Sequence, residues 1–303
     1  MGHKCQIYSC KTLIDLQSVL KRKPDLVVLS VKFIPMENGQ DIWLSEYFEN
    51  HAVAYTGSQK NVIMFDSDKV LAKRHLQKKG ISTALFFTAQ ENEFRRDDDL
   101  PLKYPLFLKP ISAANSNGVD NDSYVSSFTD FERKVSAIKN TFNQATLVEE
   151  YMGGAEYTVA MLTTKSGELL VSAVEVVPPR SNERRQILCK DTKKENIEVL
   201  RKITDQQIHH EVRRIAFEVF IGIEAEGFAR VDIKSNESGK CFFMEVNLVP
   251  GMTLGSSYFP EAFRVDSELS YDQVVSHIID YCLSKDIKAM QYTADFYFEY
   301  GQD

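Results

Sequence analysis

Residues 228–257 contain the feature that most constrains the fold, two short strand-like segments separated by a run of turn-forming residues. Residues 229–233 (ARVDI) alternate apolar and polar side chains, as a half-buried strand does. Residues 235–240 (SNESGK) have the composition of a turn, and residues 241–247 (CFFMEVN) form the predicted return strand. The stretch therefore predicts a β-hairpin.

This hairpin would gather polar side chains on one of its faces. Strand side chains repeat every two residues, so Arg230 and Asp232 share a face of the first strand. Glu245 and Asn247 share a face of the second strand for the same reason. If the two faces coincide, their oxygen atoms suit Mg²⁺, which prefers one or two carboxylates plus substrate phosphates. A strand face with ordinary solvated charges is the alternative that the hairpin alone leaves open.

The composition excludes several classes of protein. A net charge of -7 over 303 residues argues against a protein that binds nucleic-acid backbones, which usually carries a basic face. The 5 cysteines include no CxxC pair, which predicts reduced thiols in the cytoplasm and neither a disulfide framework nor a zinc site. No run of 18 apolar residues is present, so no membrane span is expected.

The first part of the chain predicts a small α/β unit. An amphipathic helix is expected over residues 12–23, and the apolar run 25–31 (DLVVLSV) is typical of a buried parallel strand. A helix over residues 42–50 and a short strand at 53–55 would complete the unit.

A strong helix is expected next, over residues 68–79, ended by Gly80. Lys69 and Lys73 are one turn apart and share a face of this helix. The ordinary interpretation of such a lysine pair is a solvated basic helix end.

The rest of the chain predicts strands and helices around two polar loops. Residues 111–119 form a loop of small residues, and residues 178–192 form a long basic loop of the kind that is functional or disordered in a compact domain. Strands are expected at 104–110, 145–150, 156–162 and 169–177, and helices at 128–139, 204–222 and 271–284.

Several short motifs occur in an order that resembles a known family. The most specific is residues 245–253 (EVNLVPGMT), and the others are 55–58 (YTGS), 68–69 (DK), 107–110 (FLKP) and 147–151 (LVEEY). Together they resemble the ATP-grasp superfamily, and within it the D-alanine–D-alanine ligase group. The resemblance implies an α/β (α+β) ATP-grasp fold, with a shortened N-terminal α/β domain and two α+β subdomains that clamp ATP. The domains would span residues 1–66, 67–152 and 153–303.

The resemblance also implies a chemistry. These ligases use ATP to activate a carboxylate as an acyl phosphate, which an amine then attacks, releasing ADP and phosphate. Mg²⁺ or Mn²⁺, as two ions, would offset the charge of the triphosphate. Asp232, Glu245 and Asn247 look like the metal ligands, and Arg230 looks like the group that holds the transferred phosphoryl.

The nucleotide site follows from the same resemblance. Lys69 and Lys109 look like the lysines that reach the ATP phosphates, and Glu156 looks like the carboxylate that accepts the ribose hydroxyls. The residues that look like the hinge framing adenine are Glu149, Glu150, Tyr151 and Met152.

Two loops and the acceptor site complete the resemblance. Ser116 lies in the small-residue loop 114–118, where Asn115 stands in place of the usual serine. Lys190 is the best match for the lysine of the active-site lid, with Arg184 or Arg185 as alternatives. The residues that resemble those holding the acceptor's carboxylate are Gly251, Ser256 and Ser257.

The N-terminal region departs from the family. Residues 1–20 lack the glycine-rich strand and loop whose glutamate grips the ammonium of the first D-alanine, and residues 35–41 (PMENGQD) take the place of the H-G-x-x-G-E-D-G loop of the ligases. We therefore expect small-molecule carboxylate and amine substrates with a donor other than D-alanine. An authentic D-alanine–D-alanine ligase with a divergent N-terminus, a kinase and a non-catalytic ATP-binding relative are the alternatives. The related ligases are commonly dimers, and a homodimer stays open.

Overall fold

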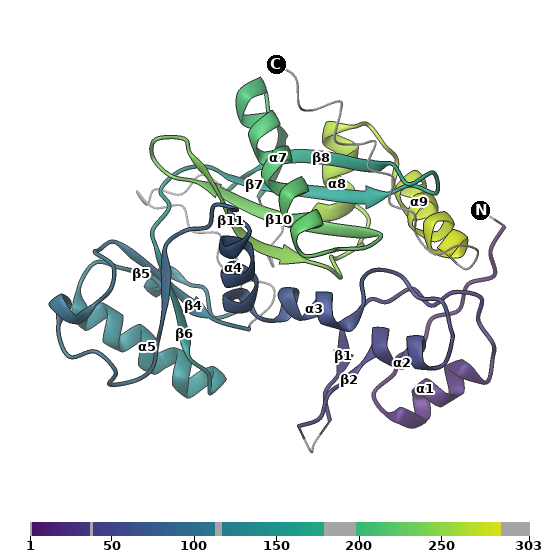
Figure 1. The fold of residues 1–303 in the computed structure, drawn as a ribbon, viewed down its shortest axis with the longest axis horizontal. Coiled ribbons are helices and arrows are strands. Elements are labelled where there is room, and N and C mark those ends of the chain that lie inside the picture. The colour runs from purple at the N-terminus through teal and green to yellow at the C-terminus, as the bar shows by residue number, and fades with distance from the viewer. Residues whose placement is uncertain (1, 37–38, 113–116, 179–197, 286–303) are drawn as a thin grey trace.

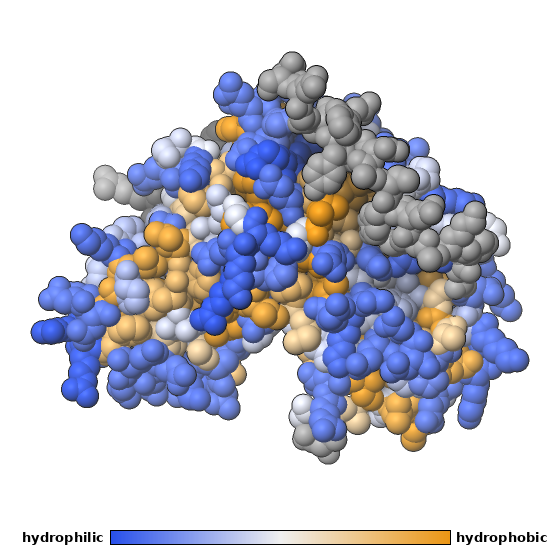
Figure 2. All heavy atoms as spheres, in the orientation of Figure 1, coloured by the Kyte–Doolittle hydropathy of each residue, from blue (hydrophilic) through white to orange (hydrophobic). Residues whose placement is uncertain are grey.

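The structure is a computed structural model that describes residues 2–36, 39–112, 117–178 and 198–285. Figure 1 shows an N-terminal unit, a central unit around a four-stranded sheet and a C-terminal unit around a five-stranded sheet. Helices α3 (Lys60–Ser67) and α4 (Lys69–Lys78) lie where the three units meet. In Figure 2, the surface is indented between the central and N-terminal units along the lower edge of this view.

The N-terminal unit is a small helical layer with a two-stranded ribbon. It consists of α1 (Leu13–Leu20), β1 (Phe33–Ile34), β2 (Ile42–Trp43) and α2 (Leu44–Asn50). Thr12 caps α1 and forms a capping box with Asp15, which explains where the predicted helix begins.

The prediction of a buried parallel strand at residues 25–31 is wrong. Residues 25–31 and 53–55 contribute a single parallel bridge, between Val27 and Tyr55. Val28 and Val31 are 62% and 53% exposed, because the unit has one small core, around Leu16, Leu29 and Phe48, that covers the segment on one side. A buried parallel strand needs cover on both faces.

The central unit is an antiparallel sheet in the order β3-β6-β4-β5. Helix α5 (Phe128–Phe142) packs against it through Phe131, Val135 and Ile138. The strands are β3 (Phe86–Ala89), β4 (Leu106–Pro110), β5 (Tyr124–Val125) and β6 (Thr146–Glu150), with short 3-10 turns at Asp97–Asp99 and Asn121–Ser123. The strands and helix expected here are confirmed within a few residues.

The C-terminal unit is an antiparallel sheet in the order β11-β10-β7-β8-β9. Helix α7 (Gln206–Gly222) covers one face, and helices α8 (Tyr258–Asp266) and α9 (Tyr271–Ser284) cover part of the other. The strands are β7 (Glu156–Thr163), β8 (Leu169–Val177), β9 (Val199–Lys202), β10 (Phe228–Ser235) and β11 (Cys241–Asn247). The predicted hairpin is therefore confirmed as β10 and β11.

The face covered by α8 and α9 changes character along the strands. Its apolar end includes Ala160, Leu162 and Phe228, which pack against Phe259 and Phe263 of α8. Further along the same face, β7 and β10 carry Thr158 and Asp232, which are register partners. The helices thus leave a polar end of the sheet beside α4.

Helix α4 is placed by its two ends. Asp68 caps it by accepting hydrogen bonds from the N–H groups of Val70 and Leu71, each at 2.9 Å. Gly80, with φ of 80°, ends it as the sequence predicted, since a left-handed residue at this position favours glycine. Its buried residues Ala72 and Leu76 join the core of the C-terminal unit.

Gly154, in the segment between β6 and β7, packs closely against the backbone at the end of β10. Substitutions at Gly154 and at its neighbour Gly153 should therefore differ in their effect on stability. A Cβ at Gly154 would lie 2.6 Å from the carbonyl oxygens of Ser235 and Asn236, whereas one at Gly153 would meet the flexible side chain of Glu237 at 3.1 Å. We expect Gly154→Ala to lower the free energy of unfolding in urea by about 1–3 kcal/mol, because backbone must shift. The control Gly153→Ala should change it far less. Equal effects of the two substitutions would contradict this account.

Candidate active site

The cross-strand register brings the predicted hairpin residues together. Arg230 pairs with Asn247, and Asp232 pairs with Glu245, across β10 and β11. Side chains of directly opposed residues lie on the same face of a sheet. The coincidence of faces that the sequence left conditional is therefore present in the structure, at the polar end of the face.

Asp232 organises this group through hydrogen bonds to both of its oxygens. The Arg230 guanidinium donates from Nε to Oδ1 at 3.0 Å and from Nη2 to Oδ2 at 2.8 Å. Thr158 donates its hydroxyl to Oδ1 at 2.7 Å, and Asn247 donates Nδ2 to Oδ2 at 3.2 Å. Burial opposes the charge of Arg230, but the Asp232 carboxylate outweighs it and holds the pKa of Arg230 above its ordinary value. Arg230 is thus a fixed, oriented cation.

Glu245 is the more accessible carboxylate of the pair. One of its oxygens lies 3.5 Å from Nζ of Lys69 on α4. Its side chain is 28% exposed, against 11% for Asp232. A divalent cation prefers hard oxygen donors, and Asp232, Glu245 and the amide of Asn247 form such a donor set on one face. The residues present therefore fit a magnesium or manganese site.

A buried ion cluster lies next to this face. It consists of Lys73, Glu149 and Lys109, called here the lysine–glutamate cluster. The Glu149 oxygens lie 2.6 Å from Nζ of Lys73 and 2.7 Å from Nζ of Lys109, and the carboxylate is fully buried. Burial alone would raise the pKa of Glu149, but the charges on Lys109 and Lys73 outweigh it and hold that pKa below its ordinary value. Burial would lower the pKa of Lys109, but Glu149 outweighs this effect and raises it, so these two groups form an ion pair. Burial lowers the pKa of Lys73 against the attraction of Glu149, which lies 2.6 Å away.

The interpretation of Lys69 and Lys73 as a solvated helix end is wrong. Both lysines are buried, and Lys73 has no exposed surface. The physical reason is the place of α4, whose face carrying both lysines lies against β11 of the C-terminal sheet and β6 of the central sheet. Helical spacing identified the shared face, but it could not show that anionic partners would come from two distant strands.

The predicted adenine hinge is partly engaged within the protein. The N–H groups of Glu150 and Tyr151 donate to the carbonyls of Leu85 and Pro105 at 3.0 and 3.1 Å. The Glu149 carboxylate belongs to the lysine–glutamate cluster, so its side chain faces the lysines. Met152 is buried beside this segment. Any backbone donor to a purine would then come from Met152 onward.

Glu156, expected at the ribose, begins β7 on the same face as Asp232. It is the register partner of Lys234, and its carboxylate lies 3.3 Å from that lysine's Nζ. Its side chain is about as exposed as that of Glu245, 22% against 28%. The polar end of the face thus carries carboxylates on β7, β10 and β11.

The predicted acceptor loop is stabilised by Ser257. Its hydroxyl accepts a hydrogen bond from the N–H of Thr253 at 2.9 Å, and a Cβ on Gly251 would lie only 2.8 Å from that oxygen. Gly251 is therefore required for this close approach. Ser256 is exposed on the same turn.

Sequence reasoning missed Asp66 of α3, which accepts a hydrogen bond from the start of this loop. Its Oδ2 accepts a hydrogen bond from the N–H of Leu248 at 2.7 Å, and its Oδ1 lies 2.9 Å from Nζ of Lys32 in the N-terminal unit. Asp66 thereby ties the residue after Asn247 to the N-terminal unit. An aspartate in the last turn of a helix gives no sequence signal of such a role.

Tyr258 was also missed. Its ring lies under the Arg230 guanidinium, 5.4 Å from Cζ to the ring centroid, and its hydroxyl donates to Glu198 at 2.5 Å. Stacking on an aromatic ring further fixes the orientation of Arg230. Tyr258 directly follows the predicted acceptor residues, and this position was the only signal that could have found it.

Four predicted loop residues lie outside the described part of the chain. They are Ser116 of the small-residue loop and the lid candidates Lys190, Arg184 and Arg185. Within the described ranges, no group of three or more His, Cys, Asp or Glu residues could hold a metal ion.

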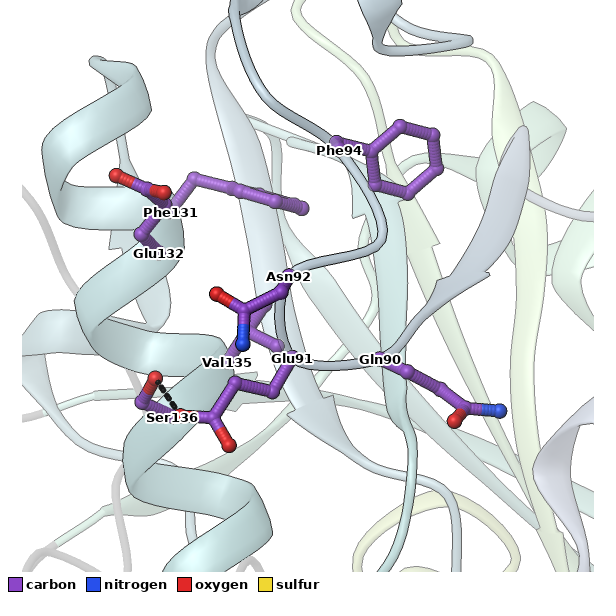
Figure 3. A pocket seen from close by; sticks show the side chains of 8 residues that line it. All are labelled: Gln90, Glu91, Asn92, Phe94, Phe131, Glu132, Val135 and Ser136. Atoms are coloured by element: carbon purple, nitrogen blue, oxygen red, sulfur yellow. Dashed lines mark hydrogen bonds between the residues drawn. The ribbon is translucent and has the colours of Figure 1, made fainter.

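A separate small pocket lies on the central unit, between the segment after β3 and helix α5 (Figure 3). Its volume is about 40 Å³, and Phe94 and Phe131 form part of its wall. Glu91 accepts a hydrogen bond from the Ser136 hydroxyl at 2.6 Å across it. The pocket has room for a water or two and not for a nucleotide.

Comparison with known proteins shows the family. The family model described as D-ala D-ala ligase C-terminus matches residues 76–280, which is more than half of the chain. The chain belongs to the D-alanine–D-alanine ligase family. It is 26% identical over 242 residues to the D-alanine–D-alanine ligase of Trichlorobacter lovleyi, covering 79% of this chain and 73% of the relative. It is 28% identical over 264 residues to that of Aquifex aeolicus, covering 86% and 84%.

The fold comparison agrees with the family. The D-alanine–D-alanine ligase of Bacillus anthracis, solved in complex with ATP, superposes with a TM-score of 0.69 at 22% identity, covering 90% of this chain and 84% of that one. The predicted ATP-grasp fold is confirmed. The chain is accordingly an ATP-dependent ligase that forms C–N bonds, of the D-alanine–D-alanine ligase type.

None of the helices described is both long and apolar enough to cross a membrane.

The buried charge of Glu149 predicts a pH dependence of stability. Its folded-state pKa is depressed, so it stabilises the fold above its unfolded pKa of about 4.3, and this contribution is lost as the pH falls through the folded value. At pH 7, we expect Glu149→Gln to lower the free energy of unfolding by about 3–5 kcal/mol, because two buried lysines lose their partner. The deficit should shrink as the pH falls below about 4. Urea unfolding at several pH values measures it.

The matched control for this experiment is Glu237→Gln. Glu237 is exposed in the turn of the β10–β11 hairpin, so removing its charge should change stability little at any of these pH values. A deficit of Glu149→Gln that stays constant from pH 7 to pH 3 would show that folding does not depress the pKa of Glu149.

Proposed function

We propose that this member of the D-alanine–D-alanine ligase family activates a carboxylic acid other than D-alanine and joins it to an amine. The main support for this proposal comes from the sequence. Residues 1–20 lack the glutamate that grips the donor ammonium in the ligases that this chain resembles. The structure supports it, since residues 2–11 contain no helix or strand that could present such a residue. An unpaired substrate ammonium in a closed site is costly.

The charge pattern beside the acceptor loop supports the same proposal. The N-terminal unit contributes Lys32 here, and Asp66 of α3 neutralises it while holding the N–H of Leu248. Asp66 is therefore already paired and poorly suited to grip a substrate ammonium. A different amino acid, a peptide or another carboxylic acid is the class of donor we propose.

The proposed chemistry uses the oriented groups of the polar face. Arg230, fixed by Asp232 and Tyr258, would stabilise negative charge on the phosphoryl group and the tetrahedral intermediate. Asp232, Glu245 and Asn247 would hold Mg²⁺ or Mn²⁺, as two ions, and the ions would offset the repulsion between triphosphate and carboxylate.

The proposed nucleotide contacts come from both sheets. Lys109 on β4 and Lys69 on α4 would reach the phosphates, and Glu156 on β7 would accept the ribose hydroxyls. The adenine would lie at the segment from Glu149 to Met152. Ser116 and a lid residue, Lys190 or one of Arg184 and Arg185, would complete the phosphate site.

The proposed acceptor site is the turn after β11. The exposed Ser256 and the backbone at Gly251 would hold the acceptor's carboxylate, and Ser257 would shape the pocket by fixing Thr253. A serine at 257 makes this pocket more polar than a leucine would.

The donor is tested by measuring ADP release across a panel of amino acids, peptides and small acids, with mass spectrometry of the products. We expect release with a donor other than D-alanine and an amide product of that donor. Release with D-alanine alone, giving the D-alanine dipeptide, would establish the alternative of an authentic D-alanine–D-alanine ligase. Binding of ATP without ADP release for any panel member would favour a non-catalytic relative.

The metal ligands are tested by near-isosteric substitutions in the same hairpin. We expect Asp232→Asn and Glu245→Gln each to lower kcat by roughly 100-fold or more, because each removes a carboxylate ligand of the cation that would offset the phosphate charge. The melting temperature should change little for Glu245→Gln, since that side chain is partly exposed.

The control is again Glu237→Gln, which changes a carboxylate in the turn of the same hairpin and should keep the rate of the unmodified protein. A rate like that of the unmodified protein in either Asp232→Asn or Glu245→Gln would refute the metal assignment.

A further inference from the structure

We propose that Lys73 is a positioning residue for ATP binding, which keeps the charge of Lys109 available to phosphate and fixes the distance between the two sheets. The inference rests on the proposed role of Lys109 at the phosphates and of Glu245 at the metal. Neither the sequence pattern nor the proposed mechanism gives Lys73 a task, although it is fully buried among charged groups.

Each of the two large sheets supplies Lys73 with one acceptor and one ring. From the central sheet come the Glu149 carboxylate, at 2.6 Å, and the Phe86 ring, with its centroid at 5.8 Å. From the C-terminal sheet come the carbonyl oxygen of Phe243, at 3.3 Å, and the ring of the same residue, at 5.7 Å. A single ammonium group therefore bonds to both sheets.

Lys73 also sets the net charge of the lysine–glutamate cluster. Glu149 presents one oxygen to each lysine, so the cluster of two lysines and one carboxylate has a net formal charge of +1. Without Lys73, the charge of Glu149 would cancel that of Lys109, and an incoming phosphate would meet a neutral pair. Lys73 cannot reach solvent itself, so its effect on a ligand passes through Glu149 and Lys109.

Lys73 also links β11 to the central sheet and so affects the spacing between the two sheets. Phe243 lies two residues before Glu245 on β11, and its N–H donates to the carbonyl of Ser82 at 3.0 Å. The bond from Lys73 to the Phe243 carbonyl is a second contact to the same residue. One turn earlier on α4, Lys69 lies 3.5 Å from Glu245. Lys73 thus fixes Glu245 on one sheet relative to Lys109 on the other.

The test compares the affinities for ATP and for adenosine, measured by competition against a fluorescent ATP analogue. We expect Lys73→Met to weaken ATP binding roughly 10- to 100-fold, the equivalent of one charge-assisted hydrogen bond, and adenosine binding by less than about threefold. The control Lys78→Met removes an exposed lysine from the same helix and should leave both affinities unchanged. Equal weakening of ATP and adenosine, or no weakening of ATP, would overturn the proposal.

A second variant covers the case in which Lys73→Met does not fold. Lys73→Met/Glu149→Gln removes both buried charges, and replacing both partners of a buried pair is far less damaging than removing one. Because Lys109 would again carry an uncancelled charge, the ratio of the ATP affinity to the adenosine affinity should return to within about threefold of that of the unmodified protein. A double variant in which this ratio stays lowered by more than threefold would overturn the proposal.

The same measurements separate this inference from the proposed function. An unmodified protein that binds no ATP would refute the nucleotide site as a whole. An unmodified protein that binds ATP, with Lys73→Met binding it equally well, would refute the role of Lys73 alone.

Discussion

A single buried carboxylate, Glu149, holds the centre of this molecule together. It bonds to Lys109 on its own sheet and to Lys73 on helix α4, and Lys73 in turn bonds to β11 of the other sheet. Ionised groups are buried only when they are paired, so neither sheet can move away from α4 without exposing or isolating a charge. The arrangement of the two sheets therefore depends on a buried ion cluster, in which Lys109 keeps a small exposed surface.

One face of the C-terminal sheet is apolar at one end of its strands and polar at the other. Its apolar end is covered by α8 and α9, while its polar end carries Arg230, Asp232 and their partners on β11. The opposite face packs against α7, so this end is the place where polar groups of the sheet meet α4 and the central unit. The proposed function assigns specificity to the turn after β11 and to the N-terminal unit, which meet at Asp66.

The parts of the fold that follow from local patterns were predictable. Alternation gave the hairpin and its polar face, helical spacing gave α4, α5, α7 and α9, and the motif at 245–253 indicated the family. The prediction of a parallel strand at residues 25–31 was wrong because an apolar run does not reveal whether the fold will cover both of its faces. The roles of Lys73 and Asp66 were missed for a related reason, since Glu149 lies 76 positions from Lys73 and Leu248 lies 182 positions from Asp66, and only the tertiary fold brings them near.

We propose that the polar face of β10 and β11 binds a divalent cation, and that ATP binds beside it between the two sheets. A crystal structure with Mn²⁺ and a non-hydrolysable ATP analogue tests it most directly, through the anomalous scattering of manganese. We predict a peak with oxygen ligands from Asp232, Glu245 and Asn247 at about 2.0–2.3 Å, and analogue phosphates near Lys109. Bound nucleotide with the manganese peak away from these three residues would contradict the account.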